Sequence, residues 1–285
     1  MLKYIGKRIL SLIPVMFVVS VVVFLVTYLI PGGPATALLG LEASSDQIAA
    51  LNAELGFDRP FLVQYADWFM DVLHGDWGRS YFLQQSVLEA IAEYFGPTIS
   101  LAILAQIIAL ILSVPLGIIA AYKRGTAVDV TAVTASLLGT AIPGFLLSMF
   151  LMLFFGVYHH WFPVSGYVGL DQGLLEHLRY LFVPALSLGI VQAAYITRMT
   201  RSSLLEVLYK NFIRTARAKG LKEKKVILTY ALKNAAPAIL TAVGQSFGSL
   251  VTGTIVTETL FNIPGIGMLT MGAINRRDSF LIPGA

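Results

Sequence analysis

Five long apolar stretches constrain the fold of this chain more than any other feature. They run from about Ile9 to Ile30, Pro97 to Tyr122, Val130 to Val157, Tyr180 to Ile196 and Ala235 to Val256, and none contains Asp, Glu, Lys, Arg or His. A helix that crosses a bilayer needs roughly 20 mostly apolar residues, so each stretch predicts a membrane span. The low share of charged residues, 13%, agrees with this, since soluble chains keep roughly a quarter of their residues charged. We therefore predict an all-α, polytopic membrane protein with a single transmembrane domain, residues 1–285.

The first stretch has an alternative interpretation as a cleaved signal peptide. Its apolar run, ILSLIPVMFVVSVVVFLVTYLI, is longer than the apolar region of a signal peptide, and no small-residue cleavage site follows it. Pro14 is acceptable in a span because neighbouring helices can satisfy the carbonyl group that it leaves without a donor. The sequence therefore favours a membrane span here.

The distribution of Lys and Arg predicts the orientation of the spans, because these residues are enriched in cytoplasmic loops. Fifteen of the 20 lie in the amino-terminal segment, in the turn after the second span and in the segment 197–234. The loop 31–96 instead carries nine Asp and Glu residues. We expect the amino terminus and 197–234 to be cytoplasmic and 31–96 to be external. Cations confined to one side of a membrane also argue against a nucleic-acid partner.

Five spans that start in the cytoplasm place the carboxyl terminus outside. The last residues, RRDSFLIPGA, end without a polar tail. Our interpretation is that a sixth span is expected but missing from this chain. A natural five-span protein is the alternative.

The segment 197–234 predicts a helix, a turn and a second helix. Apolar residues recur at helical spacing from Leu204 to Ala216, with Ser202 or Ser203 as the expected amino-terminal cap. Gly220 follows where the stripe ends, and a second helix is expected from about Lys222 to Leu232. The basic face could lie on anionic lipid headgroups or form an ordinary positive loop. Its small residues would also let another protein approach closely.

The order of several motifs resembles a known family. RTARAKGL at Arg214 to Leu221, followed by ALKNAAPAILT, resembles the cytoplasmic "EAA" loop of permease subunits from bacterial binding-protein-dependent ABC importers. The variant is that of the dipeptide, oligopeptide, glutathione and nickel group. The segments IPGGPA, LGFDRPFLVQYADW, HGDWGRSY and FNIPGIGMLTMGAINRRD agree in order and spacing, so the resemblance covers essentially the whole chain. It places the chain with the first of the two permease subunits of such systems.

The resemblance departs from the family pattern in two places. Where the general motif begins with Glu-Ala-Ala, this chain has Arg214, Thr215 and Ala216, so only Ala216 and Gly220 match outright. Family members also continue past the RRD segment into a final span and a short basic tail, whereas this sequence stops at Ala285.

The resemblance implies a type I ABC importer permease fold and a division of labour between subunits. The ATPase-coupling loop would comprise Arg214, Thr215, Ala216, Arg217, Ala218, Lys219, Gly220 and Leu221 and would dock into a cytoplasmic ATPase. The implied partners are a second homologous permease, two ATPase subunits that bind ATP and Mg, and an extracytoplasmic substrate-binding protein. We expect no catalytic residue, cofactor or metal site in this chain, which has no GxxxxGK[ST] phosphate loop.

Neutral polar residues mark a candidate translocation path. They are Gln192, Tyr195, Gln245, Ser249 and Thr252. Hydrogen bonding between packed helices is the competing interpretation, because Gly244 and Gly248 form a small-xxx-small pattern. A proton- or sodium-coupled carrier would normally bury ionisable groups near the bilayer centre. That carrier, and a membrane scaffold without transport activity, are the alternative functions.

The external loop and two histidines leave further alternatives open. The loop contains an amphipathic stretch, Ser44 to Gly56, and could form a folded cap that receives the binding protein or a cover without that contact. His159 and His160 could indicate a metal substrate, but they also fit an interfacial position beside Trp161. The sequence leaves the substrate open among peptides, glutathione, nickel chelates and similar solutes.

Overall fold

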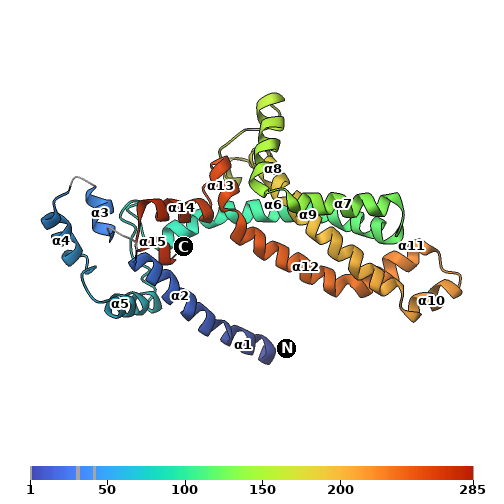
Figure 1. Ribbon diagram of the computed structural model, residues 1–285, viewed down its shortest axis with the longest axis horizontal. Helices are drawn as coiled ribbons and strands as arrows, with labels where there is room; N and C mark the ends of the chain where they lie inside the picture. The colour runs from blue at the N-terminus through green and yellow to red at the C-terminus, as the bar shows by residue number, and fades with distance from the viewer. Residues whose placement is uncertain (1, 30–32, 41–42, 285) are drawn as a thin grey trace. The chain divides into compact units, whose positions relative to one another are not determined.

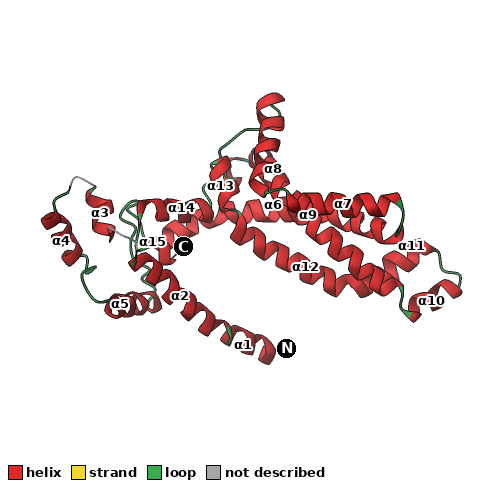
Figure 2. Ribbon diagram, viewed as in Figure 1, coloured by secondary structure: helices red, strands yellow, loops and turns green. Residues whose placement is uncertain are grey.

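The computed structural model describes residues 2–29, 33–40 and 43–284. Every named element in these ranges is a helix, as Figure 2 shows, and the ranges contain one isolated β-bridge, between Arg79 and Ser86. The all-α prediction is confirmed. The chain forms two compact units, an amino-terminal unit of Met1–Phe95 with Met268–Ala285 and a central unit of Gly96–Gly267.

The amino-terminal unit is built around an aromatic contact between two helices. Its elements are α1 (Leu2–Leu10), α2 (Leu12–Tyr28), α3 (Gly33–Leu39), α4 (Ser45–Glu54), α5 (Phe61–Leu73), α15 (Leu281–Gly284), the start of α6 (Val87–Tyr122) and most of α14 (Ile266–Arg276) (Figure 1). Phe24 of α2 packs against Tyr65 and Trp68 of α5, with ring centroids 5.5 and 5.4 Å away. The hydroxyl groups of Ser20 and Tyr65 share a hydrogen bond of 2.8 Å. The predicted amphipathic stretch forms α4.

The central unit contains the rest of α6 and the longest run of packed helices. Its other elements are α7 (Ala127–Ala141), α8 (Gly144–Leu151), the π-helix η1 (Met152–Tyr158), the 3-10 turn η2 (Leu170–Gln172), α9 (Leu174–Leu208), α10 (Asn211–Ala218), α11 (Glu223–Lys225), the π-helix η3 (Val226–Ala231), α12 (Leu232–Gly253) and α13 (Ile255–Phe261). Helix α9 contacts α7, α8 and α12. The core includes Leu101, Leu181, Leu250, Phe261 and Ile263, which are at most 1% exposed.

Glycine allows α6 and α9 to approach closely. A Cβ atom on Gly189 of α9 would lie 2.9 Å from Ile108 Cγ2 and 3.0 Å from the carbonyl oxygen of Ala105. A Cβ atom on Gly117 of α6 would lie 2.6 Å from Thr200 Cβ. Small residues are the usual means by which membrane helices bring their backbones together.

The third predicted span, Val130 to Val157, is divided in the structure. Helix α7 ends at Ala141, α8 begins at Gly144, and the two segments are bent by 98°. Pro143 lies at this break, where its missing N–H group and fixed φ disfavour a continuous helix. Four helices, together with this bent pair, are long and apolar enough to cross a membrane, and the five predicted spans overlap them.

The prediction that Ser202 or Ser203 caps a separate helix is wrong. Helix α9 runs without interruption to Leu208, so both serines lie inside it. The interruption comes later, at Lys210, whose ψ of 150° is extended. Leu204 and Ala216 pack into the same core, which explains why the apolar stripe in the sequence continued across the break. The second predicted helix is the start of a helical run from Glu223 to Gly253.

Candidate functional site

The candidate coupling loop, Arg214–Leu221, is held by the apolar face of α10. Ile213 and Ala216 are 0% and 6% exposed and pack in a cluster with Leu204 and Val226. The remaining residues from Arg214 to Gly220 are exposed. The helix therefore has a charged, exposed face and an opposite face, with Ile213 and Ala216, that is buried in the chain. Ala216, which was expected to help a partner approach, instead faces the core of this chain.

Gly220 ends the loop in a backbone conformation that favours glycine. Its φ is +74°, and no atom of the residues that the structure describes lies within 4 Å of the position that a Cβ would take. Its N–H donates to the carbonyl of Arg217 at 2.9 Å, which closes the turn after α10. The glycine is therefore required by the turn and not by packing within this chain.

An ion pair spans this turn. Arg217 Nη2 donates to Glu223 Oε1 at 2.6 Å and Arg217 Nε donates to Glu223 Oε2 at 3.1 Å. The hydrogen bond with the Glu223 carboxylate raises the pKa of Arg217 above its usual range, so the pair stays charged. Glu223 was not among the predicted site residues. Its signal in the sequence was an acid at the start of the helix that follows the glycine turn.

The structure brings four of the five candidate path residues together in pairs. Tyr195 of α9 donates its hydroxyl hydrogen to Gln245 Oε1 of α12 at 2.8 Å, and Gln192 Nε2 donates to Ser249 Oγ at 3.5 Å. Thr252 instead bonds to the carbonyl of Gly248 on its own helix, at 3.0 Å. Hydrogen bonding between helices, the competing interpretation, is therefore observed.

The same residues also remain on the surface of the chain. Gln245, Ser249 and Thr252 are exposed. No described atom lies within 4 Å of a Cβ built on Gly244 or Gly248, so this small-xxx-small pattern makes no close helix contact within the described part of the chain. The polar face of α12 is thus available to a neighbouring subunit or to solute.

A buried carboxylate organises the loop that follows α13. Glu258 is 0% exposed, and its Oε1 accepts hydrogen bonds of 2.7 Å from the hydroxyls of Thr98 and Thr254. A Cβ on Gly267 would lie 2.8 Å from Glu258 Oε2, and one on Gly265 would overlap the carboxylate. A buried polar group needs such hydrogen bonds, so the glycines and threonines form an enclosure fitted to the Glu258 side chain. Glu258 was missed because it lies just beyond the predicted fifth span.

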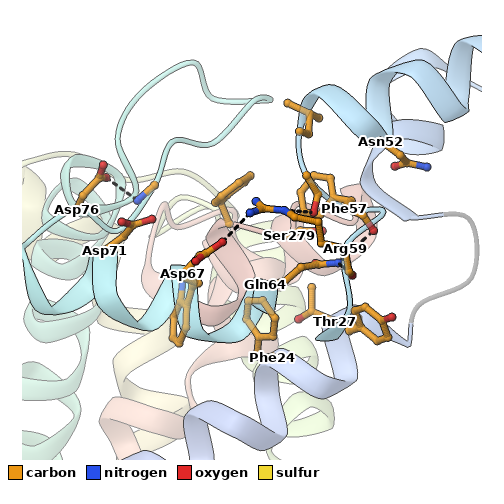
Figure 3. A pocket seen from close by; sticks show the side chains of 16 residues that line it. Phe24, Thr27, Asn52, Phe57, Arg59, Gln64, Asp67, Asp71, Asp76 and Ser279 are labelled. Atoms are coloured by element: carbon orange, nitrogen blue, oxygen red, sulfur yellow. Dashed lines mark hydrogen bonds and ion pairs between the residues drawn. The ribbon is translucent and has the colours of Figure 1, made fainter. Parts of the chain in front are cut away.

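Residues of the predicted external loop fold within the amino-terminal unit. Tyr65, Trp68 and Phe69 belong to the aromatic contact between α2 and α5. A cavity of about 600 Å³ lies beside this contact (Figure 3). In the central unit, His159 stacks on Trp161 with ring centroids 4.7 Å apart.

Comparison with known proteins adds independent evidence. The family model for the binding-protein-dependent transport system inner membrane component matches residues 113–285, and the model for the N-terminal part of such a membrane component matches residues 1–102.

Individual relatives match over nearly the whole chain. A probable peptide ABC transporter permease protein of Sinorhizobium fredii is 39% identical over 275 residues, 96% of this chain and 88% of the relative. A putative peptide transport system permease protein of Brucella suis is 41% identical and a glutathione transport system permease protein of Salmonella choleraesuis is 40% identical, each over 98% of this chain and 88% of the relative.

These matches confirm the resemblance noted in the motifs. The apolar helices agree with a multi-pass protein of the inner membrane. The chain therefore belongs to the family of inner-membrane permease components of binding-protein-dependent ABC transport systems.

Proposed function

We propose that this chain is a non-catalytic permease subunit of an ATP-driven importer. It forms the translocation path with a second permease and passes peptides or similar small solutes delivered by an extracytoplasmic binding protein. Two cytoplasmic ATPase subunits bind ATP and Mg and drive the transport. The names of relatives, which include peptide and glutathione permeases, support this class of solute.

One observation carries the proposal: α10 presents an exposed, charged face on a buried anchor. Such a helix can receive force from a partner and transmit it, because Ile213 and Ala216 connect it to the core around α9 and α12. The Arg217–Glu223 pair connects the turn to the start of the next helical run. A push on α10 would therefore reach the α9–α12 pair, where the candidate path residues lie.

The path itself is proposed on the exposed polar face of α12 with its partners on α9. Gln192, Tyr195, Gln245, Ser249 and Thr252 offer hydrogen bonds without charge. A neutral, wet surface suits a permissive conduit whose selectivity comes from the binding protein. A homologous permease opposite this face would complete the conduit.

A matched pair of glycine variants tests the coupling role. Gly125, in the turn between α6 and α7, also has a positive φ, +79°, and open space around its Cβ position. Gly220→Glu and Gly125→Glu should therefore pay a similar backbone cost of about 1–2 kcal/mol. We expect Gly220→Glu to lower ATP-dependent uptake at least tenfold and to weaken retention of the ATPase subunits. Gly125→Glu should retain the ATPase.

The assay uses the complete transporter in proteoliposomes, with the solute that the co-encoded binding protein retains. Equal uptake and equal ATPase retention in the two variants would refute the coupling role. Uptake that requires an ion gradient and ignores ATP would instead favour an ion-coupled carrier. A complete system that moves no solute would favour a membrane scaffold.

A further inference from the structure

The cavity in the amino-terminal unit is lined by none of the residues assigned to the coupling loop or the candidate path. Helices α2, α4 and α5 and the segments 56–59, 76–78 and 279–280 contribute its walls. All of these belong to one unit. Its volume, about 600 Å³, is within the range of roughly 300–1,000 Å³ typical of small-molecule sites.

The cavity wall carries an excess of negative charge. Asp67, Asp71 and Asp76 line it, and Arg59 is the one cation among the described residues that line it. Figure 3 shows these carboxylates in succession, with Arg59 directed at Asp67. Arg59 Nη1 donates to Asp67 Oδ2 at 2.7 Å, so this pair neutralises itself. Two negative charges remain, and a wall of this sign raises the local concentration of cations.

Asp71 is the carboxylate best placed to meet a ligand. Within the described part of the chain its side chain has no hydrogen-bond or ion-pair partner, whereas Asp76 Oδ1 already accepts a hydrogen bond from the N–H of Gly78 at 2.9 Å. Asp71 follows Gln64 and Asp67 at the three- and four-residue spacing that places residues on one face of α5. Its position is therefore set by a regular helix and not by a loop.

Gln64 orders one part of the cavity wall. Its side-chain amide nitrogen donates to the carbonyl oxygens of Phe57 and Arg59, at 3.1 and 2.6 Å, and the residue is 9% exposed. These bonds attach the segment 57–59 to α5. A wall ordered before binding loses less conformational entropy when a ligand enters.

Five aromatic rings line much of the remaining wall, and they favour an apolar body in the ligand. The rings are those of Phe24, Tyr28, Phe57, Trp68 and Phe280. A cation held over an aromatic face is attracted by the negative face of the ring, and an apolar body would cover the other rings. Asn52 Oδ1 and Trp68 Nε1 are also buried without hydrogen-bond partners in the described part of the chain. An N–H donor would complement the first of these atoms.

We propose that this cavity binds a primary ammonium group attached to an apolar body, with Asp71 as its main counter-ion and Asp76 as the second. The inference goes beyond the proposed function, since binding here requires neither ATPase nor a second permease. The ammonium group could belong to a soluble amine, such as the free amino terminus of a short peptide, or to a phosphatidylethanolamine headgroup. The phosphate of that lipid would meet an acidic wall, which favours the soluble amine.

Binding is tested with the full-length chain in phosphatidylcholine nanodiscs. The probe is 2-phenylethylamine, which is protonated at pH 7, and its neutral match is 2-phenylethanol. Isothermal titration calorimetry should show saturable binding of the amine and at least tenfold weaker binding of the alcohol. Equal affinity for the two probes would overturn the proposal.

A matched pair of variants locates the binding. Asp71→Asn should weaken amine binding at least tenfold. Asp58→Asn removes an exposed acid close to Arg59 that does not line the cavity, and it should change the affinity less than twofold. An equal effect of the two substitutions would also overturn the proposal.

Two further arms keep the test decisive even if Asp71→Asn does not fold. Raising the salt concentration from about 0.05 to about 0.5 M should weaken amine binding to the unaltered chain several-fold and leave the alcohol unchanged, because salt screens ionic contacts. A salt-independent amine affinity would contradict the ionic contact. Loss of amine binding in phosphatidylethanolamine nanodiscs would assign the ammonium site to the lipid headgroup, and unchanged binding would assign it to soluble amines.

Discussion

The amino-terminal helical run and α9 are both long enough to cross a membrane, yet the more apolar of the two is the less covered. The most apolar 18-residue stretch of Gly6–Tyr28 has a mean hydropathy of 3.0, and 0% of it is buried within the described part of the chain. The most apolar 18-residue stretch of Leu174–Leu208 has a mean hydropathy of 1.5, and 56% of its residues are buried. A soluble protein would show the opposite order. Lipid tails are as apolar as leucine, so hydropathy alone gives membrane helices no reason to pack.

The two helices are therefore specified by different properties. Exposed residues of α2 include large apolar side chains such as Met16 and Val18. A hydrogen bond between the hydroxyl groups of Ser20 and Tyr65 joins α2 to α5. In α9 the contacts depend on small and polar side chains. Gly189 permits close approach of α6, and Ser187 accepts a buried hydrogen bond of 2.8 Å from Ser148. Hydropathy is therefore enough to specify α2 as a membrane helix, whereas α9 also requires a surface that fits its neighbouring helices.

The test with the largest expected effect removes the ion pair between α9 and α7. Arg201 Nε and Nη2 donate to the two carboxylate oxygens of Asp129, at 2.5 and 2.8 Å, and the Asp129 side chain is 6% exposed. Asp129→Ala leaves a partly buried guanidinium without its partner, which should lower the free energy of unfolding by about 3 kcal/mol. Unfolding in mixed dodecyl maltoside and SDS micelles measures this change.

The matched control is the exposed pair of the amino-terminal unit. Arg59 and Asp67 are 50% and 53% exposed, so Asp67→Ala should cost at most about 1 kcal/mol. Equal losses for Asp129→Ala and Asp67→Ala would show that burial within the chain does not distinguish the two regions.

The difference also explains which parts of the fold the sequence could predict. The apolar stretches predicted the positions of the membrane helices, because a long run of residues without charge is visible in the sequence itself. The true end of α9 was missed because Arg198 and Arg201 were interpreted as loop residues. In the structure Arg198 donates to the carbonyl of Ser136 at 3.1 Å and Arg201 pairs with Asp129, so both cations bond α9 to α7. Pairing between distant helices leaves no periodic signal in a single sequence.

The candidate site also has one feature that the sequence predicted and one that it did not. The turn at Gly220 was predictable because a positive φ favours glycine, and the structure has that turn. The enclosure of Glu258 was not predicted, because it joins Thr98 to residues about 160 positions later in the chain. The glycine turn could be read from the sequence, whereas the partners of the buried Glu258 side chain could not.

A second, smaller test compares two glycines in candidate spans. Gly189→Leu forces a side chain against Ile108 and the backbone of Ala105, so it should cost about 2 kcal/mol of unfolding free energy. Gly6→Leu enters open space and removes a poor helix former, so it should be neutral or stabilising by up to about 1 kcal/mol. The same micelle unfolding assay applies. A Gly6→Leu variant that loses as much stability as Gly189→Leu would show that the amino-terminal helix is also specified by shape.

The smallest test asks how much the polar contacts of α9 contribute beyond its shape. Tyr195→Phe removes the hydroxyl that bonds Gln245 on α12 and leaves the ring in place. Hydrogen bonds between membrane helices contribute about 0.6 kcal/mol on average, so we expect a loss of that size. Tyr158→Phe, at a side chain that is 72% exposed, should change nothing measurable. A loss above about 2 kcal/mol for Tyr195→Phe would exceed the range measured for such bonds. Polar contacts, and not the close fit at Gly189, would then be the property that separates α9 from α2.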